Sequence, residues 1–175
     1  MTDRLPFDPI EEAARHWRDH GWAEAAEGMA AVTSIMRAQA IVLARVEDVL
    51  RPLALTFARY ELLMLLSFSS RGAMPMSKAS VRLQVHPTSI TNAAARLESA
   101  GLVVRRQHPS DRRTVLVEIT DAGRTLAGEA TKRLNDRVFS RPGLPPESLR
   151  TLVDVLRELR AEAGDFGSFQ GGDPG

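Results

Sequence analysis

The sequence predicts a mainly α-helical protein with one small β-hairpin, an α+β fold. Through most of its 175 residues, apolar side chains recur at spacings of three and four, the period of an amphipathic helix. Between Leu102 and Ile119 the spacing changes toward two, which is typical of strands. Pro52, Gly101 and the segment 140–146 (SRPGLPP) interrupt these patterns and separate the predicted elements.

Three helices are predicted in the first part of the chain. Residues 8–22 form a short amphipathic helix, with Asp8 as the N-cap and a proline in the first helical position. The second helix, 23–50, is longer than usual, so we expect another chain or a second layer to cover it. The third, 56–68, contains the run LLMLL, is apolar almost all round and should be the most buried element.

Two shorter helices joined by a turn follow. A connection that contains Gly and Pro leads to a helix over 77–83, with Ser77 as its predicted N-cap. A turn at 85–86 separates it from the next helix, 87–100, which begins with a proline and stops at Gly101. This arrangement predicts a helix-turn-helix.

The predicted hairpin comes directly after the second of these helices. Its strands are 102–104 and 114–119, and the connection 105–113 (RRQHPSDRR) is longer and more basic than a tight turn. We therefore expect that connection to project as a mobile loop. Helix, turn, helix, strand, basic loop and strand is the order of a winged helix-turn-helix.

Two helices complete the pattern. The first is capped by Thr120 or Asp121 and runs to about Phe139. The last opens at 145–147 and carries an apolar stripe suited to a partner helix, made of Leu149, Leu152, Val153, Leu156 and Leu159. The sequence thus divides into an N-terminal extension (1–22), a helical dimerisation region (23–52 and 121–163), a winged helix-turn-helix DNA-binding domain (53–120) and a flexible tail (164–175).

Charge supports a nucleic-acid partner only locally. The net charge of the chain is +1, but residues 77–113 contain seven Lys and Arg against two acids, a local net charge of +5. On the helix 87–100, Ser89, Asn92 and Arg96 share one stripe, and these residue types can read base edges in the major groove. Ile90, Ala94 and Leu97 would face the core.

Further contacts with the DNA backbone are expected around this stripe. Arg112 or Arg113 at the hairpin tip would enter the minor groove, more plausibly Arg112, while Asp111 accepts hydrogen bonds within the loop. Arg105 and Arg106 either contact phosphates or guard the edge of the sheet. The predicted DNA-binding residues are Lys78, Pro87, Thr88, Ser89, Thr91, Asn92, Arg96, Arg105, Arg106, Arg112 and Arg113.

Residues 85–124, VHPTSITNAAARLESAGLVVRRQHPSDRRTVLVEITDAGR, resemble the recognition helix, wing and following helix start of the MarR family of winged helix-turn-helix regulators. The order RLESAGLV, DRR, a short strand and ITDAGR is the most similar part, and the resemblance covers about residues 23–163. It implies a homodimer whose N- and C-terminal helices interlock. We expect this dimer to bind a pseudo-palindromic duplex. It also implies that a small effector, bound near the junction of the two lobes, lowers DNA affinity.

The segment 8–22 lies outside that pattern and resembles the additional N-terminal helix of urate-responsive members. Trp17 would match their ligand-stacking tryptophan, but Glu61 stands where they carry an aspartate and Ala93 where they carry a pocket arginine. Urate is therefore not predicted. Trp17 and Glu61 are candidate ligand-binding residues, with a packing anchor and a solvent-facing carboxylate as the ordinary alternatives.

Other classes of function find little support. The chain has no cysteine, no phosphate-binding glycine loop and no nucleophile elbow, so neither catalytic residues nor cofactors are predicted. His16 and His20 have the spacing of a metal site but lack a third ligand. No signal peptide or membrane span is expected, which favours the cytoplasm. The predicted function is a ligand-responsive transcriptional repressor that binds double-stranded DNA; the alternative is a winged helix that docks proteins.

Overall fold

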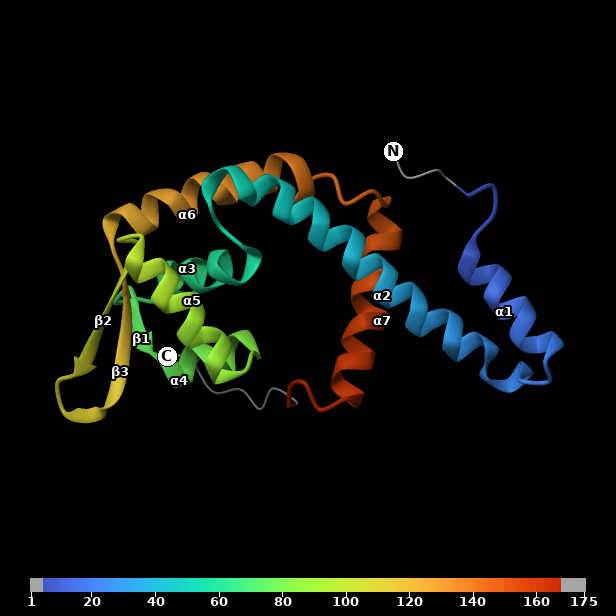
Figure 1. The fold of residues 1–175 in the computed structure, drawn as a ribbon, viewed down its shortest axis with the longest axis horizontal. Coiled ribbons are helices and arrows are strands. Elements are labelled where there is room, and N and C mark those ends of the chain that lie inside the picture. Colours follow the sequence, from blue (N-terminus) through green and yellow to red (C-terminus); the bar gives the residue numbers. More distant parts are fainter. Residues whose placement is uncertain (1–4, 168–175) are drawn as a thin grey trace. The chain divides into compact units, whose positions relative to one another are not determined.

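The computed structural model describes residues 5–167, except the side chain of Arg112. The chain forms two compact units, Met1–Val138 and Phe139–Gly175. The first unit contains most of the helices and a small three-stranded sheet (Figure 1). This is the predicted mainly helical fold with a winged helix-turn-helix.

Two helices form an antiparallel pair at the start of the chain. In α1 (Pro9–Asp19) the Asp8 carboxylate accepts a hydrogen bond from the Ile10 N–H at 2.8 Å, as predicted for the N-cap. The helix ends at Asp19, earlier than predicted, and the chain reverses through Gly21 at a φ of +84°. It then enters α2 (Ala23–Leu50), whose bounds agree with the prediction.

The middle of α2 is apolar and yet exposed along the described chain. All residues from 31 to 40 are exposed, and Val32, Met36 and Ile41 leave 58%, 64% and 53% of their surface uncovered. The segment Ala23–Leu53 is even long and apolar enough to cross a membrane by length and composition, contrary to the sequence-based expectation. Only the C-terminal end of α2, with Val46, Val49 and Leu50, enters the core.

The core of the first unit is built around α3 (Phe57–Phe68), which follows the short 3-10 turn η1 (Arg51–Leu53). Leu62, Leu63 and Leu66 of α3 are fully buried, so the prediction that this helix is the most buried element is confirmed. The core continues onto α5 (Pro87–Ser99), the sheet and α6 (Asp121–Leu134). The Tyr60 hydroxyl and Thr131 Oγ1 are hydrogen-bonded at 3.0 Å and join α3 to α6.

The helix-turn-helix consists of α4 (Met76–Leu83) and α5 (Pro87–Ser99). The prediction that Ser77 caps α4 is wrong: the helix already begins at Met76 after the N-cap residue Pro75, so Ser77 lies inside the first turn. The turn between the helices is closed by Ser80, whose Oγ donates to the Val85 carbonyl at 2.6 Å.

The sheet differs from the prediction in two ways. A third strand, β1 (Ala73–Pro75), lies in the connection before α4 and pairs antiparallel with β3 (Asp111–Ile119). The strand β2 (Val103–His108) also pairs with β3, so the strand order is β1-β3-β2. Both long strands extend through the predicted loop 105–113 and leave a short turn with an irregular register at His108. The prediction of a long, mobile loop at 105–113 is therefore wrong.

The base of the hairpin is fastened to the start of α6. Thr120 is the N-cap of α6: its Oγ1 accepts from the Gly123 N–H at 3.0 Å and donates to the Gly101 carbonyl at 2.8 Å. A Cβ added to Gly123 would lie 2.1 Å from the Leu102 carbonyl oxygen, so only glycine fits there. These contacts account for Thr120 and Gly123 in the TDAG sequence, which follows the β2–β3 hairpin, here called the wing, and opens α6.

After α6 the first unit ends in a π-helical turn, η2 (Asn135–Phe139), in which Val138 is buried. The second unit contains α7 (Pro146–Glu162), close to its predicted bounds. No residue of α7 is buried within the described chain, and the predicted stripe includes Val153 and Leu159, which are 60% and 52% exposed. Of the predicted flexible tail, residues 168–175 lie outside the described residues.

Candidate nucleic-acid interface

The helix α5 has one buried face and one exposed polar face. Ile90, Ala94 and Leu97 are at most 2% exposed, which confirms the predicted inner face. Ser89 and Asn92 on the opposite stripe are exposed, and so is Arg96 one turn further on. The buried side holds the helix against the core, so the polar stripe is presented to solvent by a rigid element.

The first turn of α5 is organised by its cap. His86 is the N-cap, and its ring Nδ1 accepts a hydrogen bond from the Thr88 N–H at 3.2 Å. The Thr91 Oγ1 donates to the Pro87 carbonyl at 3.0 Å. Pro87, Thr88 and Thr91 are all exposed, so the predicted contact residues of this turn lie at the surface.

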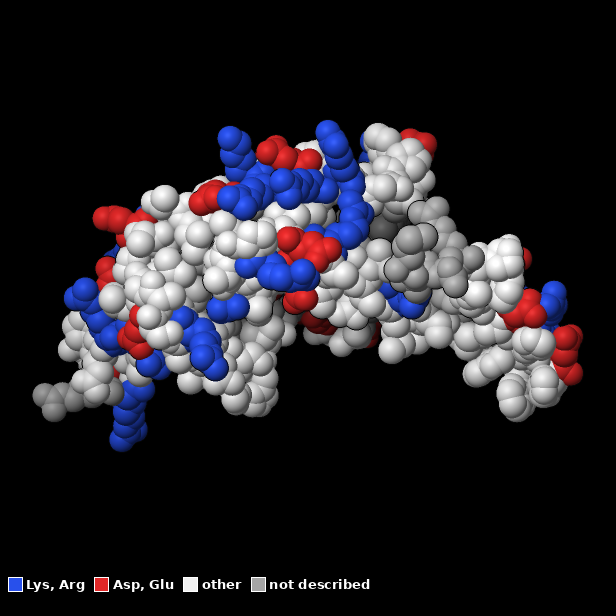
Figure 2. All heavy atoms as spheres, turned by 45° about the horizontal axis from the view of Figure 1, so that its top comes forward, with Lys and Arg blue, Asp and Glu red and all other residues white. Residues whose placement is uncertain are grey.

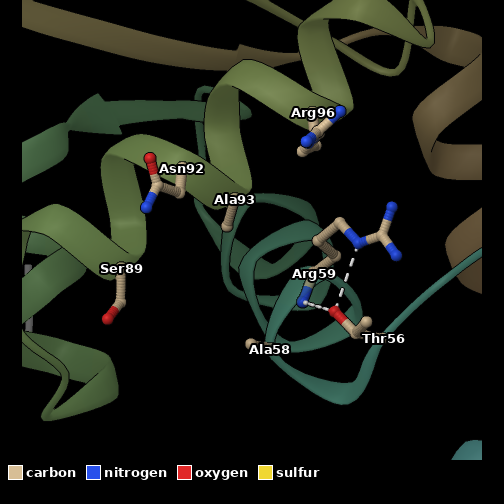
Figure 3. A pocket seen from close by; sticks show the side chains of 7 residues that line it. All are labelled: Thr56, Ala58, Arg59, Ser89, Asn92, Ala93 and Arg96. Atoms are coloured by element: carbon tan, nitrogen blue, oxygen red, sulfur yellow. Dashed lines mark hydrogen bonds between the residues drawn. The ribbon is translucent and has the colours of Figure 1, made fainter.

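A groove of about 460 Å³ separates α5 from the beginning of α3 (Figure 3). It is lined on the α5 side by Ser89, Asn92, Ala93 and Arg96, and on the α3 side by Thr56, Ala58 and Arg59. The Arg59 and Arg96 side chains come from opposite walls and lie toward the same end of the groove, the right-hand end in Figure 3. Sequence reasoning missed Arg59, because it assigned the whole of α3 to the core.

Both predicted wing arginines of β2 are engaged by carboxylates. Arg105 donates from Nε to Glu98 Oε2 at 2.7 Å and from its backbone N–H to Glu98 Oε1 at 3.1 Å, so Glu98 at the end of α5 holds the wing. These hydrogen bonds lower the pKa of the Glu98 carboxyl. Arg106 lies 3.3 Å from Glu118 on the neighbouring strand. Contact of Arg105 and Arg106 with phosphate stays a prediction.

The hairpin tip is held by Asp111. Its carboxylate accepts from the Thr114 hydroxyl at 2.7 Å and from the Arg113 backbone N–H at 3.0 Å, and these bonds lower the pKa of the Asp111 carboxyl. Asp111 thus accepts hydrogen bonds within the wing, as predicted, from the Thr114 hydroxyl and the Arg113 backbone. The Arg113 side chain is exposed, while that of Arg112 lies outside the described part of the chain.

Basic side chains gather around this part of the molecule. On the face drawn in Figure 2, several Lys and Arg side chains lie at the end that carries the wing, with some Asp and Glu side chains among them, and a second group of mixed charge lies nearer the middle of the view. Lys78 is exposed on α4, next to α5 in the helix-turn-helix. The predicted DNA-binding residues whose side chains are described are therefore all at the surface.

The two candidate ligand residues do not come together. Trp17 on α1 packs edge-on against Trp22 with ring centroids 5.5 Å apart, as an anchor of the α1–α2 pair does. Glu61 belongs to α3, and Figure 1 places α1 and α3 at opposite ends of α2. Ligand contact by either residue stays a prediction.

The Glu61 carboxyl gives a testable pH dependence. Burial raises its pKa above the ordinary value of 4.5, because the charged form is poorly solvated. The folded protein then loses stability as pH rises through the interval between the unfolded and the raised folded pKa. The Glu61→Gln variant cannot ionise at this position. The difference between its free energy of unfolding and that of the wild type should therefore shift in favour of the variant as pH rises.

Urea denaturation at several pH values from about 4.5 to about 8 measures this difference in unfolding free energy. The interval covers ordinary and raised carboxyl pKa values. Glu158→Gln on the exposed surface of α7 is the matched control for loss of a carboxylate. A difference for Glu61→Gln that stays constant over the range would contradict the prediction.

Comparisons with known proteins agree with this geometry. The family model of MarR matches residues 55–115. The crystal structure of Sco5413, a MarR family transcriptional regulator from Streptomyces coelicolor, is 47% identical with a TM-score of 0.74, over 81% of this chain and 99% of that one. The HTH-type transcriptional regulator YdgJ of Bacillus subtilis is 32% identical over 105 residues, which are 59% of this chain and 62% of YdgJ.

Structures of a third similar protein, CouR, have been solved with a small molecule and with DNA. CouR from Rhodococcus jostii RHA1, bound to p-coumaroyl-CoA, is 27% identical with a TM-score of 0.63, over 77% of this chain and 92% of that one. The transcriptional repressor CouR bound to a 23-mer DNA duplex is 26% identical with a TM-score of 0.66, over 72% and 89%. The residues that the family model matches, 55–115, include the helix-turn-helix and most of the wing described above.

Proposed function

This chain belongs to the MarR family of transcriptional regulators, and from this premise we propose that it binds double-stranded DNA sequence-specifically, as a homodimer, and represses transcription. Its site of action would be the cytoplasm. The residues 53–120 would form the DNA-binding domain, and α2, α6 and α7 would supply the dimerisation region. The regulators it resembles are DNA-binding proteins and not enzymes.

The exposed polar stripe of α5 is the observation that carries this proposal. Ser89, Asn92 and Arg96 project from a helix whose other side is fixed in the core. Asn suits the paired donor and acceptor of adenine, and Arg suits guanine, so the stripe can discriminate bases in the major groove. The wing would add contacts to the neighbouring backbone or minor groove, which position the helix.

The exposed apolar surface of α2 supports the homodimer. Monomers rarely leave contiguous large apolar side chains uncovered, and a second copy would bury Val32, Met36 and Ile41. The charged residues Arg37 and Arg45 within the same stretch argue against a membrane as the covering phase. A symmetric dimer would present two α5 helices to half-sites about 34–36 Å apart on a pseudo-palindromic operator.

Repression would follow from occupancy, because a dimer over a promoter blocks polymerase. A small effector would release the DNA by binding more tightly to a dimer whose two α5 helices are wrongly spaced for the operator. CouR, which has been solved both with DNA and with p-coumaroyl-CoA, is a similar protein that binds both kinds of partner. For this chain, the identity of the effector is left to a screen.

A salt titration of DNA binding tests the proposed function. Fluorescence anisotropy would compare the gene's own upstream DNA with a scrambled duplex of the same length, over a range of salt concentrations. The ratio of the two affinities measures specificity, and the slope against salt counts phosphate contacts. We expect a preference of about 10³-fold or more for the native duplex. Weak, equal binding to both would favour the protein-docking alternative.

A further inference from the structure

The groove between α3 and α5 brings two basic residues from different helices to one surface. Arg59 comes from the first turn of α3 and Arg96 from the last turns of α5 (Figure 3). The alanines Ala58 and Ala93 lie between the helices, so no large side chain fills the space of about 460 Å³. The groove therefore stays open to a group approaching from outside.

Arg59 is held in position by its neighbour Thr56. The Thr56 Oγ1 accepts a hydrogen bond from the Arg59 Nε at 3.2 Å and another from the Arg59 backbone N–H at 3.4 Å. The same hydroxyl thus caps α3 and fixes the base of the guanidinium. The two terminal nitrogens are left to donate elsewhere, and less side-chain entropy remains to be lost when they bind.

The charges in this groove are not neutralised from within. In the part of the chain that the structure describes, neither Arg59 nor Arg96 has an ion-pair partner, and no acidic residue lines the groove. The wing arginines Arg105 and Arg106 differ, since Glu98 and Glu118 already engage them. An anion entering the groove would meet positive charge without displacing a carboxylate.

We propose that Arg59, positioned by Thr56, binds a backbone phosphate of the DNA whose bases the α5 stripe reads. This inference rests on the proposed function. A phosphate is the expected anion because Ser89, Asn92 and Arg96 on the same wall are the proposed base-reading residues, so the sugar–phosphate backbone would pass next to them. Arg59 would supply affinity and register, and sequence preference would stay with α5.

The test compares Arg59→Gln with the wild type in the anisotropy assay. We expect Arg59→Gln to lower affinity for the native and the scrambled duplex by a similar factor, roughly tenfold, as loss of a charge-assisted hydrogen bond does. The slope of log affinity against log salt should fall by about 1. Arg18→Gln on α1, which removes an exposed arginine far along the chain, is the matched control and should change neither quantity.

Two further variants separate positioning from charge. Thr56→Val removes the hydroxyl that orients Arg59 and should weaken binding with the salt slope nearly unchanged, whereas Thr56→Ser should restore wild-type affinity. Thermal unfolding of each variant shows whether α3 remains folded. If Arg59→Gln binds both duplexes as the wild type does, the inference is wrong, while the specificity of the wild type still supports the proposed function.

The groove could instead take a small free oxoanion, and titration calorimetry with inorganic phosphate distinguishes this source. We expect no saturable binding of free phosphate, since a single ion lacks the neighbouring contacts of a duplex. Saturable phosphate binding that Arg59→Gln abolishes, together with unchanged DNA binding, would overturn the DNA assignment. Failure of the wild type to prefer its native duplex would instead count against the proposed function itself.

Discussion

Alanine in place of Asn92 or Arg96 is expected to lower affinity for the specific operator by roughly 5- to 150-fold, or about 1–3 kcal/mol, for each residue. Affinity for scrambled DNA should change far less. Both side chains are exposed on α5, and a base-edge contact forms only with the correct sequence, whereas a phosphate contact forms with any. Competition binding with native and scrambled duplexes measures the two losses side by side.

Arg112→Ala is expected to behave differently from Asn92→Ala and Arg96→Ala. An arginine at the wing tip would bind the minor groove or backbone, so its loss should weaken binding across many sequences with little change in discrimination. Arg18→Ala on α1 controls for the loss of one positive charge. Equal losses of Asn92→Ala on native and scrambled DNA would remove α5 from the role of reader.

The helices were largely predictable because each carries its own local signals. Asp8 caps α1, Pro87 opens α5 and the bounds of α2 agree with the apolar pattern, all through interactions within a few residues of the chain. The same locality explains the polar stripe of α5, since burial of Ile90, Ala94 and Leu97 follows from helical periodicity.

The sheet and the groove were harder to predict because they depend on distant residues. The strand β1 is only three residues long, without room for a periodic pattern, and forms by pairing with β3 some forty residues later. The charged segment of the hairpin was expected to be a loop, but a two-stranded ribbon exposed to solvent tolerates charges on both strands. Arg59 approaches α5 only once α3 and α5 have packed.

The second large effect is expected on dimerisation, from charged substitutions on the exposed apolar face of α2. Val32→Glu combined with Met36→Glu places two carboxylates one turn apart in the middle of α2, where the wild-type side chains are 58% and 64% exposed in one chain. If a second copy covers this face, each uncompensated charge must be desolvated, and the dimer dissociation constant should rise roughly 100-fold or more. Sedimentation velocity over a concentration series measures this constant.

Deletion from Pro145 onward provides an independent test of the same interface, because it removes α7 and its exposed Val153 and Leu159 while leaving the first unit intact. It should also shift the protein toward monomers. Val81→Glu changes an apolar residue of α4 that is 74% exposed, and as the matched control it should leave the dimer unaffected.

A soluble deletion variant and a Val32/Met36 double variant that both dimerise like the wild type would contradict the assignment of α2 and α7 to dimerisation. If instead both become monomeric and lose operator binding while Val81→Glu remains dimeric, the paired half-site mechanism gains its support, because one α5 helix contributes only half of the base contacts.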